Sequence, residues 1–159
     1  MDSGRPRIWK DGFYQPNQMT KVEFSKFESE RHMKDFIIQN LDFFANDILG
    51  IKFKSFENEF KISDGQKKRK SIDLLIHSVT GEKIAIELKN PTYKSELQSA
   101  LGQCLTYMTA LDISGQKIDR MVLVSSVYDF LVPITISKMK LPVEFVVMDM
   151  DKFSKMSLI

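Results

Sequence analysis

The sequence predicts an α/β protein in which one mixed sheet is flanked by helices. A helical pattern precedes three strands, a second helix and a buried strand follow, and a short helix and a last strand complete the chain. This order begins αβββαβ. Strands joined by short turns pair antiparallel, whereas strands joined through a helix favour parallel pairing. The expected architecture is therefore an α/β sandwich with a mixed central sheet.

The composition is that of an ordinary globular protein. Apolar residues make up 43% of the chain and charged residues 28%, and the net charge of +2 does not by itself indicate a nucleic-acid partner. The single cysteine, Cys104, fits a reducing compartment, and with His32 and His77 it gives too few ligands for a structural zinc site. The chain lacks an apolar run of membrane-spanning length and an apolar leader, so we expect a cytoplasmic protein with no membrane partner.

We expect one domain over residues 1–159 that begins with an arm and a helix. Residues 1–20 are typical of an extended arm or a short hairpin, because glycines and prolines interrupt its apolar pairs. Residues 22–49 carry apolar side chains at helical spacing, and Gly50 predicts the end of that helix. Glu30 falls on the inward stripe, where it either lies at the edge in solvent or points toward a site.

A strand is expected over residues 51–62, where apolar side chains recur with period two. The period changes phase near Ser55, which predicts a bulge or a bend in the strand. A turn at residues 63–66 leads into a basic cluster at residues 67–70. Such clusters are more often solvated loops than binding patches, so this one is weak support for a nucleic-acid partner.

The next two strands, at residues 71–77 and 83–89, form a hairpin that carries charges in an apolar setting. Asp73 lies on the first strand, and Glu87 and Lys89 lie on the second. Charged side chains in buried strands are unfavourable unless a partner compensates them. A divalent metal ion would be such a partner.

Whether the two acids meet depends on the turn between these strands. A two-residue loop at 80–81 would place Asp73 and Glu87 on opposite faces of the sheet. A three-residue loop at 79–81 would instead set Asp73 directly opposite Glu87, with Gly81 in a left-handed conformation. That loop is common and favours glycine at its last position, so the sequence permits the pairing.

Opposed carboxylates of this kind favour a cation between them. Their Cβ atoms would lie roughly 5 Å apart, and one acid would hold a proton at neutral pH unless a cation intervened. Oxygen ligands in this arrangement suit Mg²⁺ or Mn²⁺. Lys89, on the same face as Glu87, would orient or activate a water molecule or stabilise a transition state at phosphorus. The competing interpretation, of similar weight on composition alone, is a structural acid–lysine pair.

The rest of the chain returns to helix and strand in alternation. A helix is expected over residues 94–111, and residues 120–127 form a continuous apolar run typical of a strand buried on both faces. The C-terminal part, residues 128–159, carries a short helix at 133–140 and a strand at 143–148.

The hairpin resembles the signature of the PD-(D/E)XK nuclease superfamily. Asp73 precedes the turn, and Glu87 and Lys89 form a Glu-x-Lys motif at the end of the next strand. The resemblance covers a core over residues 24–127 and implies a restriction-endonuclease-like domain with the αβββαβ order. One departure is Ile72, which stands where the family often has a proline.

A second match lies on the helix after the lysine. Gln103 and Tyr107 are similar to the Q-x-x-x-Y motif of RecB-like nucleases, and their spacing places both on one helix face. Without the hairpin they would be an ordinary helix flank. Together these motifs most resemble the nuclease domains of archaeal and actinobacterial mismatch endonucleases and their RecB-like relatives.

The resemblance implies a role for each of these residues. Asp73 and Glu87 would bind the metal together with the carbonyl of Leu88, and Lys89 would position or help to deprotonate the attacking water. Glu30 would be a further group at or near the metal.

The helix motif and the basic residues would serve the substrate. Gln103 and Tyr107 would orient the lysine or contact a DNA phosphate. The residues expected to hold the DNA backbone are Lys68, Arg69, Lys70 and Lys94.

These expectations describe a deoxyribonuclease that hydrolyses phosphodiester bonds with Mg²⁺ or Mn²⁺. A second copy of the chain is a further candidate partner, because small nucleases of this type often dimerise to cut two strands. The alternative is a catalytically inactive nucleic-acid-binding or assembly module that retains the nuclease fold, which the near-neutral charge would suit. A third interpretation keeps the acids and the lysine as a structural ion pair only.

Overall fold

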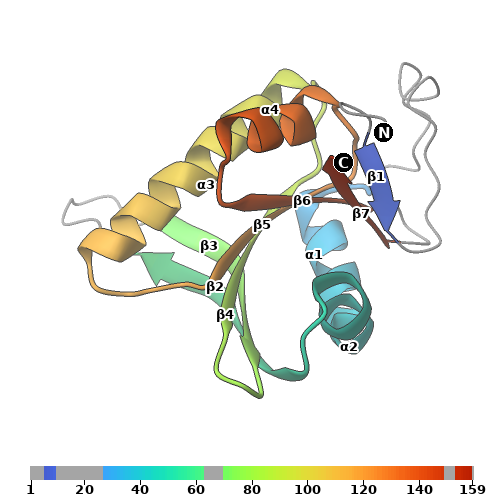
Figure 1. Cartoon of the computed structure of the whole chain (residues 1–159). Helices are drawn as coiled ribbons and strands as arrows, with labels where there is room; N and C mark the ends of the chain where they lie inside the picture. The colour runs from blue at the N-terminus through green and yellow to red at the C-terminus, as the bar shows by residue number, and fades with distance from the viewer. Residues whose placement is uncertain (1–5, 10–26, 63–69, 149–152, 159) are drawn as a thin grey trace.

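The structure is a computed structural model that describes residues 6–9, 27–62, 70–148 and 153–158, the first and last of these ranges through their backbone. In this part of the chain one seven-stranded sheet has helices on both faces (Figure 1). The strands are β1 (Pro6–Trp9), β2 (Phe53–Ile62), β3 (Lys70–Ser78), β4 (Lys83–Lys89), β5 (Arg120–Ser125), β6 (Val143–Met148) and β7 (Phe153–Leu158). The helices are α1 (Glu30–Gln39), α2 (Leu41–Phe43), the π-helix η2 (Phe44–Leu49), α3 (Ser95–Ile113) and α4 (Leu131–Met139).

The sheet is mixed, as the sequence predicts. Its order is β1-β7-β6-β5-β4-β3-β2, in which β2, β3 and β4 form an antiparallel meander. Helices α3 and α4 are the crossovers that make β4, β5 and β6 parallel. Strands β1 and β7, which period and turn signals do not predict, pair with each other and attach through β7 to β6.

Two apolar clusters fill the space between the sheet and its helices, because successive strand residues point to opposite faces. Helices α3 and α4 cover one face and α1 and η2 cover the other (Figure 1). Leu75, Ala85 and Leu123 belong to the first cluster, whereas Leu74 and Ile86 belong to the second. Strand β5 is buried on both faces, as its continuous apolar run predicts.

Of the helix expected over residues 22–49, residues 22–26 lie outside the described residues, and in the described part residues 27–29 precede the helix. Ser29 has an extended backbone, and its side chain accepts a hydrogen bond from the N–H of His32 at 3.0 Å, so the first helical residue is Glu30. Glu30 is consequently exposed at the helix start, as the first of the two alternatives for this residue expects, and it lines a cleft beside Lys89. Gly50, with φ of 71°, ends the helical segment as expected.

The remaining elements lie close to their predicted positions. The pairing of β2 with β3 shifts register between Phe53 and Ser55, which confirms the irregularity near Ser55. Helix α4 begins at Leu131, two residues before the predicted start, and contains Pro133 in its first turn, where a missing N–H is tolerated. The turn and most of the basic cluster expected at residues 63–69 lie outside the described residues.

The hairpin of β3 and β4 has the register on which the site depends. Leu74 pairs with Ile86 and Leu75 with Ala85, which sets Asp73 opposite Glu87. Gly81 has φ of 91° and ends a three-residue loop that is closed by the hydrogen bond from Ser78 N to Glu82 O at 3.0 Å. The predicted loop and register are confirmed.

Candidate active site

Strands β3 and β4 stop pairing where the two acids lie. The last paired residues are Leu74 and Ile86, and two residues beyond Ile86 the N–H of Leu88 donates to Asp73 Oδ2 at 2.8 Å. In the regular alternation of an antiparallel pair, that N–H would have donated to the carbonyl of Ile72. The Asp73 carboxylate thus takes the place of a backbone acceptor where the strands separate.

This separation also directs a backbone oxygen toward the gap. The N–H and C=O of one strand residue point to the same side of the strand. Because the N–H of Leu88 points toward β3, its carbonyl does so as well. The carbonyl of Lys89 points the other way and accepts from the N–H of Ser126 at 3.1 Å.

The Glu87 carboxyl is held in its neutral form. Its pKa is raised from 4.5 to about 9, first by burial and then by its hydrogen bond with Asp73 and the negative charge of Asp73. Lys89 opposes this shift and Glu30 adds to it. Glu87 is 5% exposed, and its Oε2 is one of two buried side-chain oxygens among the described residues that have no hydrogen-bond partner. The pair therefore shares one proton and leaves one buried oxygen available to a cation.

Helix α3 brings two further groups to the acids. Burial raises the pKa of the Cys104 thiol and of the Tyr107 hydroxyl, and the negative charges of Glu87 and Asp73 raise both further. Both side chains therefore lie within electrostatic reach of the carboxylates. Cys104 is fully buried and is a neighbour of the site that the motifs do not identify. Its place one residue after Gln103 on the buried stripe is the signal that would have found it.

Lys89 pairs with Glu30 across the cleft. Lys89 Nζ lies 3.9 Å from Glu30 Oε1, with the lysine side chain 25% exposed and the glutamate 53%. The first turn of a helix favours a negative charge, which suits Glu30 at the start of α1. Among the described residues no three His, Cys, Asp or Glu side chains are close enough to share a metal ion. The structure therefore brings Glu30 to Lys89 and does not add it to Asp73 and Glu87 as a third ligand.

A polar cleft of about 580 Å³ opens at the end of β4, between the starts of α1 and α3. Its wall includes three predicted site residues, Glu30, Lys89 and Gln103, together with Asn90, which follows Lys89 in the sequence. Asn90 holds the cleft together, because its Nδ2 donates to Phe27 O at 2.7 Å and its Oδ1 accepts from Ser126 Oγ at 2.6 Å. The segment before α1 is thereby tied to the end of β5. Nothing in the sequence motifs singles out Asn90.

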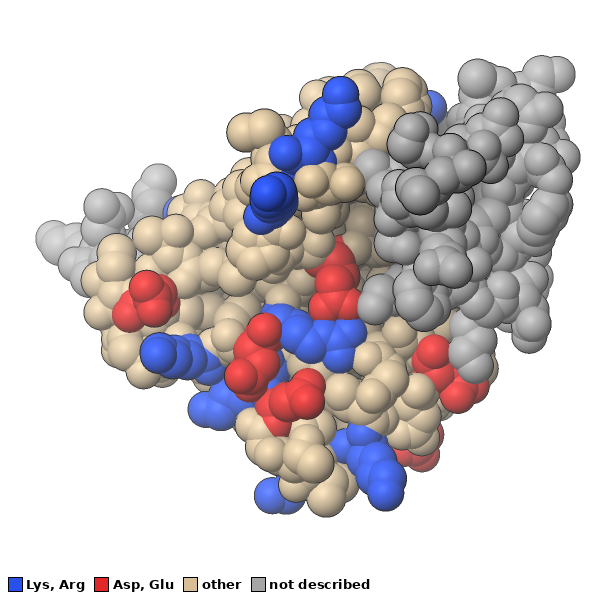
Figure 2. All heavy atoms as spheres, in the orientation of Figure 1, with Lys and Arg blue, Asp and Glu red and all other residues tan. Residues whose placement is uncertain are grey.

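The predicted phosphate-binding residues are only partly described. Lys70 is exposed at the start of β3, and Lys94 is exposed immediately before α3. Lys68 and Arg69 lie outside the described residues. On the face seen in Figure 2 the basic and acidic side chains of the described residues are intermixed and do not form a continuous basic surface.

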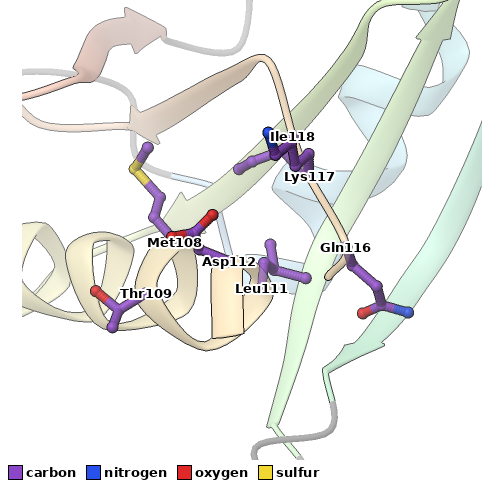
Figure 3. Close-up of a pocket in the computed structure, with 7 residues that line it drawn as sticks. All are labelled: Met108, Thr109, Leu111, Asp112, Gln116, Lys117 and Ile118. Carbon is purple, nitrogen blue, oxygen red and sulfur yellow. The ribbon is translucent and has the colours of Figure 1, made fainter. Parts of the chain in front are cut away.

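A separate hollow of about 350 Å³ lies at the far end of α3 (Figure 3). Its lining includes Met108, Asp112 and Lys117, and it contains none of the predicted site residues. The carboxylate pair influences Cys104 and Tyr107 as well, but neither Asp73 nor Glu87 lines the cleft at the end of β4. Lys89 and Glu30 connect the two, because both act on Glu87 and both line the cleft.

The strand order and the acids at the separating hairpin define the class of fold as restriction-endonuclease-like. Among solved structures, this chain is similar to the crystal structure of a repair endonuclease from Pyrococcus abyssi, with a TM-score of 0.51 and 21% sequence identity. The match covers 77% of this chain and 48% of that one, so this chain spans about half the length of its structural neighbour. At this identity the likeness establishes the fold.

Comparisons of sequence add no family to this result. No family model matches the chain, and the search of curated proteins also finds no match. None of the helices in the described residues is long and apolar enough to cross a membrane.

Proposed function

We propose that the protein is a metal-dependent deoxyribonuclease of the PD-(D/E)XK type, which hydrolyses DNA phosphodiester bonds. The observation that carries this proposal is the buried Asp73–Glu87 pair, with its unpartnered oxygen, at the point where β3 and β4 separate. A structural ion pair would satisfy such an oxygen, whereas a site built for a cation leaves it available.

The donor set suits Mg²⁺ or Mn²⁺. Asp73, Glu87 and the carbonyl of Leu88 supply oxygen ligands only, which is the preference of hard divalent cations, and water and phosphate oxygens complete such sites. When bound, the ion would take the place of the shared proton and polarise a phosphate oxygen. The 25%-exposed Lys89 side chain, beside Glu87, leaves room for water and substrate.

The side chains around the pair then have distinct tasks. Lys89 Nζ donates a hydrogen bond to the attacking water or to a phosphate oxygen, and Glu30 holds the lysine from α1. From α3, Gln103 in the wall of the cleft and Tyr107, which responds to the charge of the two acids, orient the lysine or contact a phosphate. The water oxygen attacks phosphorus and gives up a proton to solvent, and the bond from phosphorus to the leaving oxygen breaks as that oxygen takes a proton from solvent.

DNA is the proposed substrate because the structural neighbour is a repair endonuclease. Lys68, Arg69, Lys70 and Lys94 are the proposed contacts to the DNA backbone, which would make binding dependent on salt. We further propose a homodimer as the form that cuts both strands.

The test is cleavage of plasmid, linear and branched DNA with Mg²⁺, Mn²⁺ or chelator. Asp73→Asn and Glu87→Gln are expected to lose cleavage on the order of 100-fold or more, because each removes a carboxylate that would hold the metal ion, whose positive charge would stabilise the transition state. Asp112→Asn is the matched control, since Asp112 is an exposed acid of α3 outside the cleft. Circular dichroism verifies that each variant is folded.

Two outcomes would contradict the proposal. One is cleavage that both carboxylate variants retain. The other is the absence of cleavage on every DNA, combined with metal-independent DNA binding that survives the loss of both carboxylates. The second outcome would favour the non-catalytic binding module.

A further inference from the structure

Exposed aromatic side chains lie on two neighbouring loops, the one before α3, which contributes to the wall of the cleft, and the one before α4. Tyr93, between β4 and α3, is 70% exposed, and its neighbours Thr92 and Ser95 line the cleft. Phe130, which precedes the first residue of α4, is 52% exposed, and Leu131 beside it is 45% exposed. Aromatic rings left in solvent beside a polar cleft are candidates for contact with a ligand.

The two loops leave the same edge of the sheet. Strands β4 and β5 are adjacent and parallel, so their C-terminal ends lie side by side. The hydrogen bonds that Ser126 makes to Asn90 and Lys89 connect the loops directly. Helices α3 and α4 contact each other, and their starts lie near one another at the top of Figure 1. Tyr93 and Phe130 therefore rise from one edge of the sheet, the edge at which the cleft opens.

Charge around the cleft does not favour a ligand held mainly by its phosphates. The wall of the cleft carries Glu28, Glu30 and Glu96 against Lys89, and Lys94 stands next to Tyr93. Three acids against two lysines add little attraction for a polyanion at the cleft itself, so backbone charge there does not distinguish a duplex from a single strand. Stacking of bases on aromatic rings is a source of affinity that does not depend on a basic surface.

We propose that Tyr93 and Phe130 form a stacking platform for unpaired bases, so that the DNA strand enters the cleft single-stranded. The inference rests on the proposed function, because a strand whose phosphate occupies the cleft places its neighbouring bases at the rim. In a duplex the faces of the bases are covered by their stacked neighbours, whereas an unpaired strand presents them to the rings.

The test measures binding of a fluorescein-labelled single strand and of a blunt-ended duplex without unpaired bases by fluorescence anisotropy, with chelator present to prevent cleavage. Tyr93→Ala and Phe130→Ala are each expected to weaken single-strand binding roughly 5- to 100-fold, the range for loss of one base-stacking ring. Duplex binding is expected to change less than about twofold. Tyr93→Phe, which keeps the ring, should bind like the wild type.

Ile113→Ala is the matched control, because Ile113 is an 81%-exposed apolar side chain at the other end of α3. Equal losses for single strand and duplex, no loss in either alanine variant, or an equal loss in Ile113→Ala would overturn the platform. The cleavage test of Asp73→Asn is independent of this result. If the protein cleaves DNA but Tyr93→Ala binds single strands like the wild type, the stacking platform is wrong and the nuclease proposal stands. If single-strand binding depends on the rings but no DNA is cleaved, the nuclease proposal is wrong and the platform stands.

Discussion

At the scale of single residues, Glu87 is the side chain whose ionisation the fold disfavours, because the folded structure raises its pKa. It is buried on the α3 face beside Asp73, and no group in the described residues satisfies its Oε2. A carboxyl in such surroundings destabilises the folded protein at neutral pH, because the unfolded chain releases the proton that the folded chain retains. Stability is thus lower at the place where we propose the chemistry.

This predicts the pH dependence of the metal-free protein. Between the ordinary pKa of 4.5 and about 9, the folded protein binds a proton that the unfolded chain does not, so its free energy of unfolding falls as the pH rises through this window. Glu87→Gln removes this term, and near pH 8 we expect the variant to be more stable by about 2 kcal/mol or more.

The measurement is urea unfolding in chelator across that pH range. The difference in stability between variant and wild type should grow with pH, and a constant difference would contradict the prediction. Adding Mg²⁺ should stabilise the wild type and leave Glu87→Gln nearly unchanged, because a bound ligand stabilises only the form that binds it.

Glu59 of β2 has a strained backbone conformation. It has a left-handed φ of 56° and stands opposite Asp73, between Asn58 and Phe60, where the β2–β3 pairing is interrupted a second time after the shift near Ser55. We expect Glu59→Gly to stabilise the protein by roughly 0.5–1 kcal/mol, because glycine adopts this conformation without a steric penalty. Thermal unfolding checks the change, with Glu59→Ala as the control.

Glu59→Ala should give no such gain, because alanine keeps the Cβ atom and therefore the strain. The ion pair that both variants lose, between Lys34 and Glu59 at 3.8 Å, is largely exposed on the glutamate side and contributes little. A gain in the alanine variant equal to that of glycine would show that strain is not the cause.

At the scale of elements, the turn between β3 and β4 sets which side chains face each other. Shifting the pairing by one residue would move Asp73 and Glu87 to opposite faces. The left-handed Gly81 makes the three-residue loop possible, and the loop in turn makes the carboxylate pair. A local feature of one turn thus decides the geometry of the candidate site.

Two glycine substitutions test the role of this turn. Both Gly81 and Gly102 have open space where a Cβ atom would lie, but Gly81 has φ of 91° while Gly102 lies within α3. Gly81→Ala should destabilise the protein by about 1–2 kcal/mol, and Gly102→Ala should stabilise it by about 0.5–1 kcal/mol. Denaturant unfolding measures the change in the free energy of unfolding for each variant. Changes of the same sign in both variants would contradict the role assigned to Gly81.

At the scale of the whole molecule, Arg120 joins the sheet to the layer that covers one face. Its guanidinium donates two hydrogen bonds of 2.7 Å to the carboxylate of Glu144 on β6. A third, also 2.7 Å, reaches the carbonyl of Leu49 at the end of η2. The hydrogen bond with Glu144 is the main reason that the pKa of Arg120 is raised, so the guanidinium stays protonated.

Arg120→Lys keeps the positive charge but removes the guanidinium, whose N–H groups donate the three hydrogen bonds. We expect a loss of about 1–3 kcal/mol in the free energy of unfolding, because a lysine cannot reproduce all three contacts and leaves an acceptor unpaired. Arg31→Lys, on the exposed side of α1, is the matched control and should change stability by less than about 0.5 kcal/mol. Equal effects in the two variants would contradict the role of Arg120.

The sequence by itself determined the parts of this protein that depend on local rules. Helical and strand periods set the αβββαβ order, and the position of Gly81 permitted the three-residue loop that opposes Asp73 to Glu87, a register that the structure then showed. Both follow from steric preferences that act over a few residues. The acids and the lysine were identifiable because charges are unfavourable in buried strands.

Only the tertiary structure decided what distant segments do to one another. It pairs β1 with β7, places Glu30 at Lys89, and has Asn90 bind Phe27 and Ser126. These contacts join segments separated along the chain, and they follow from how whole layers pack, which no local period encodes. The cleft arises from the same packing, and with it the aromatic rim that we propose holds the substrate.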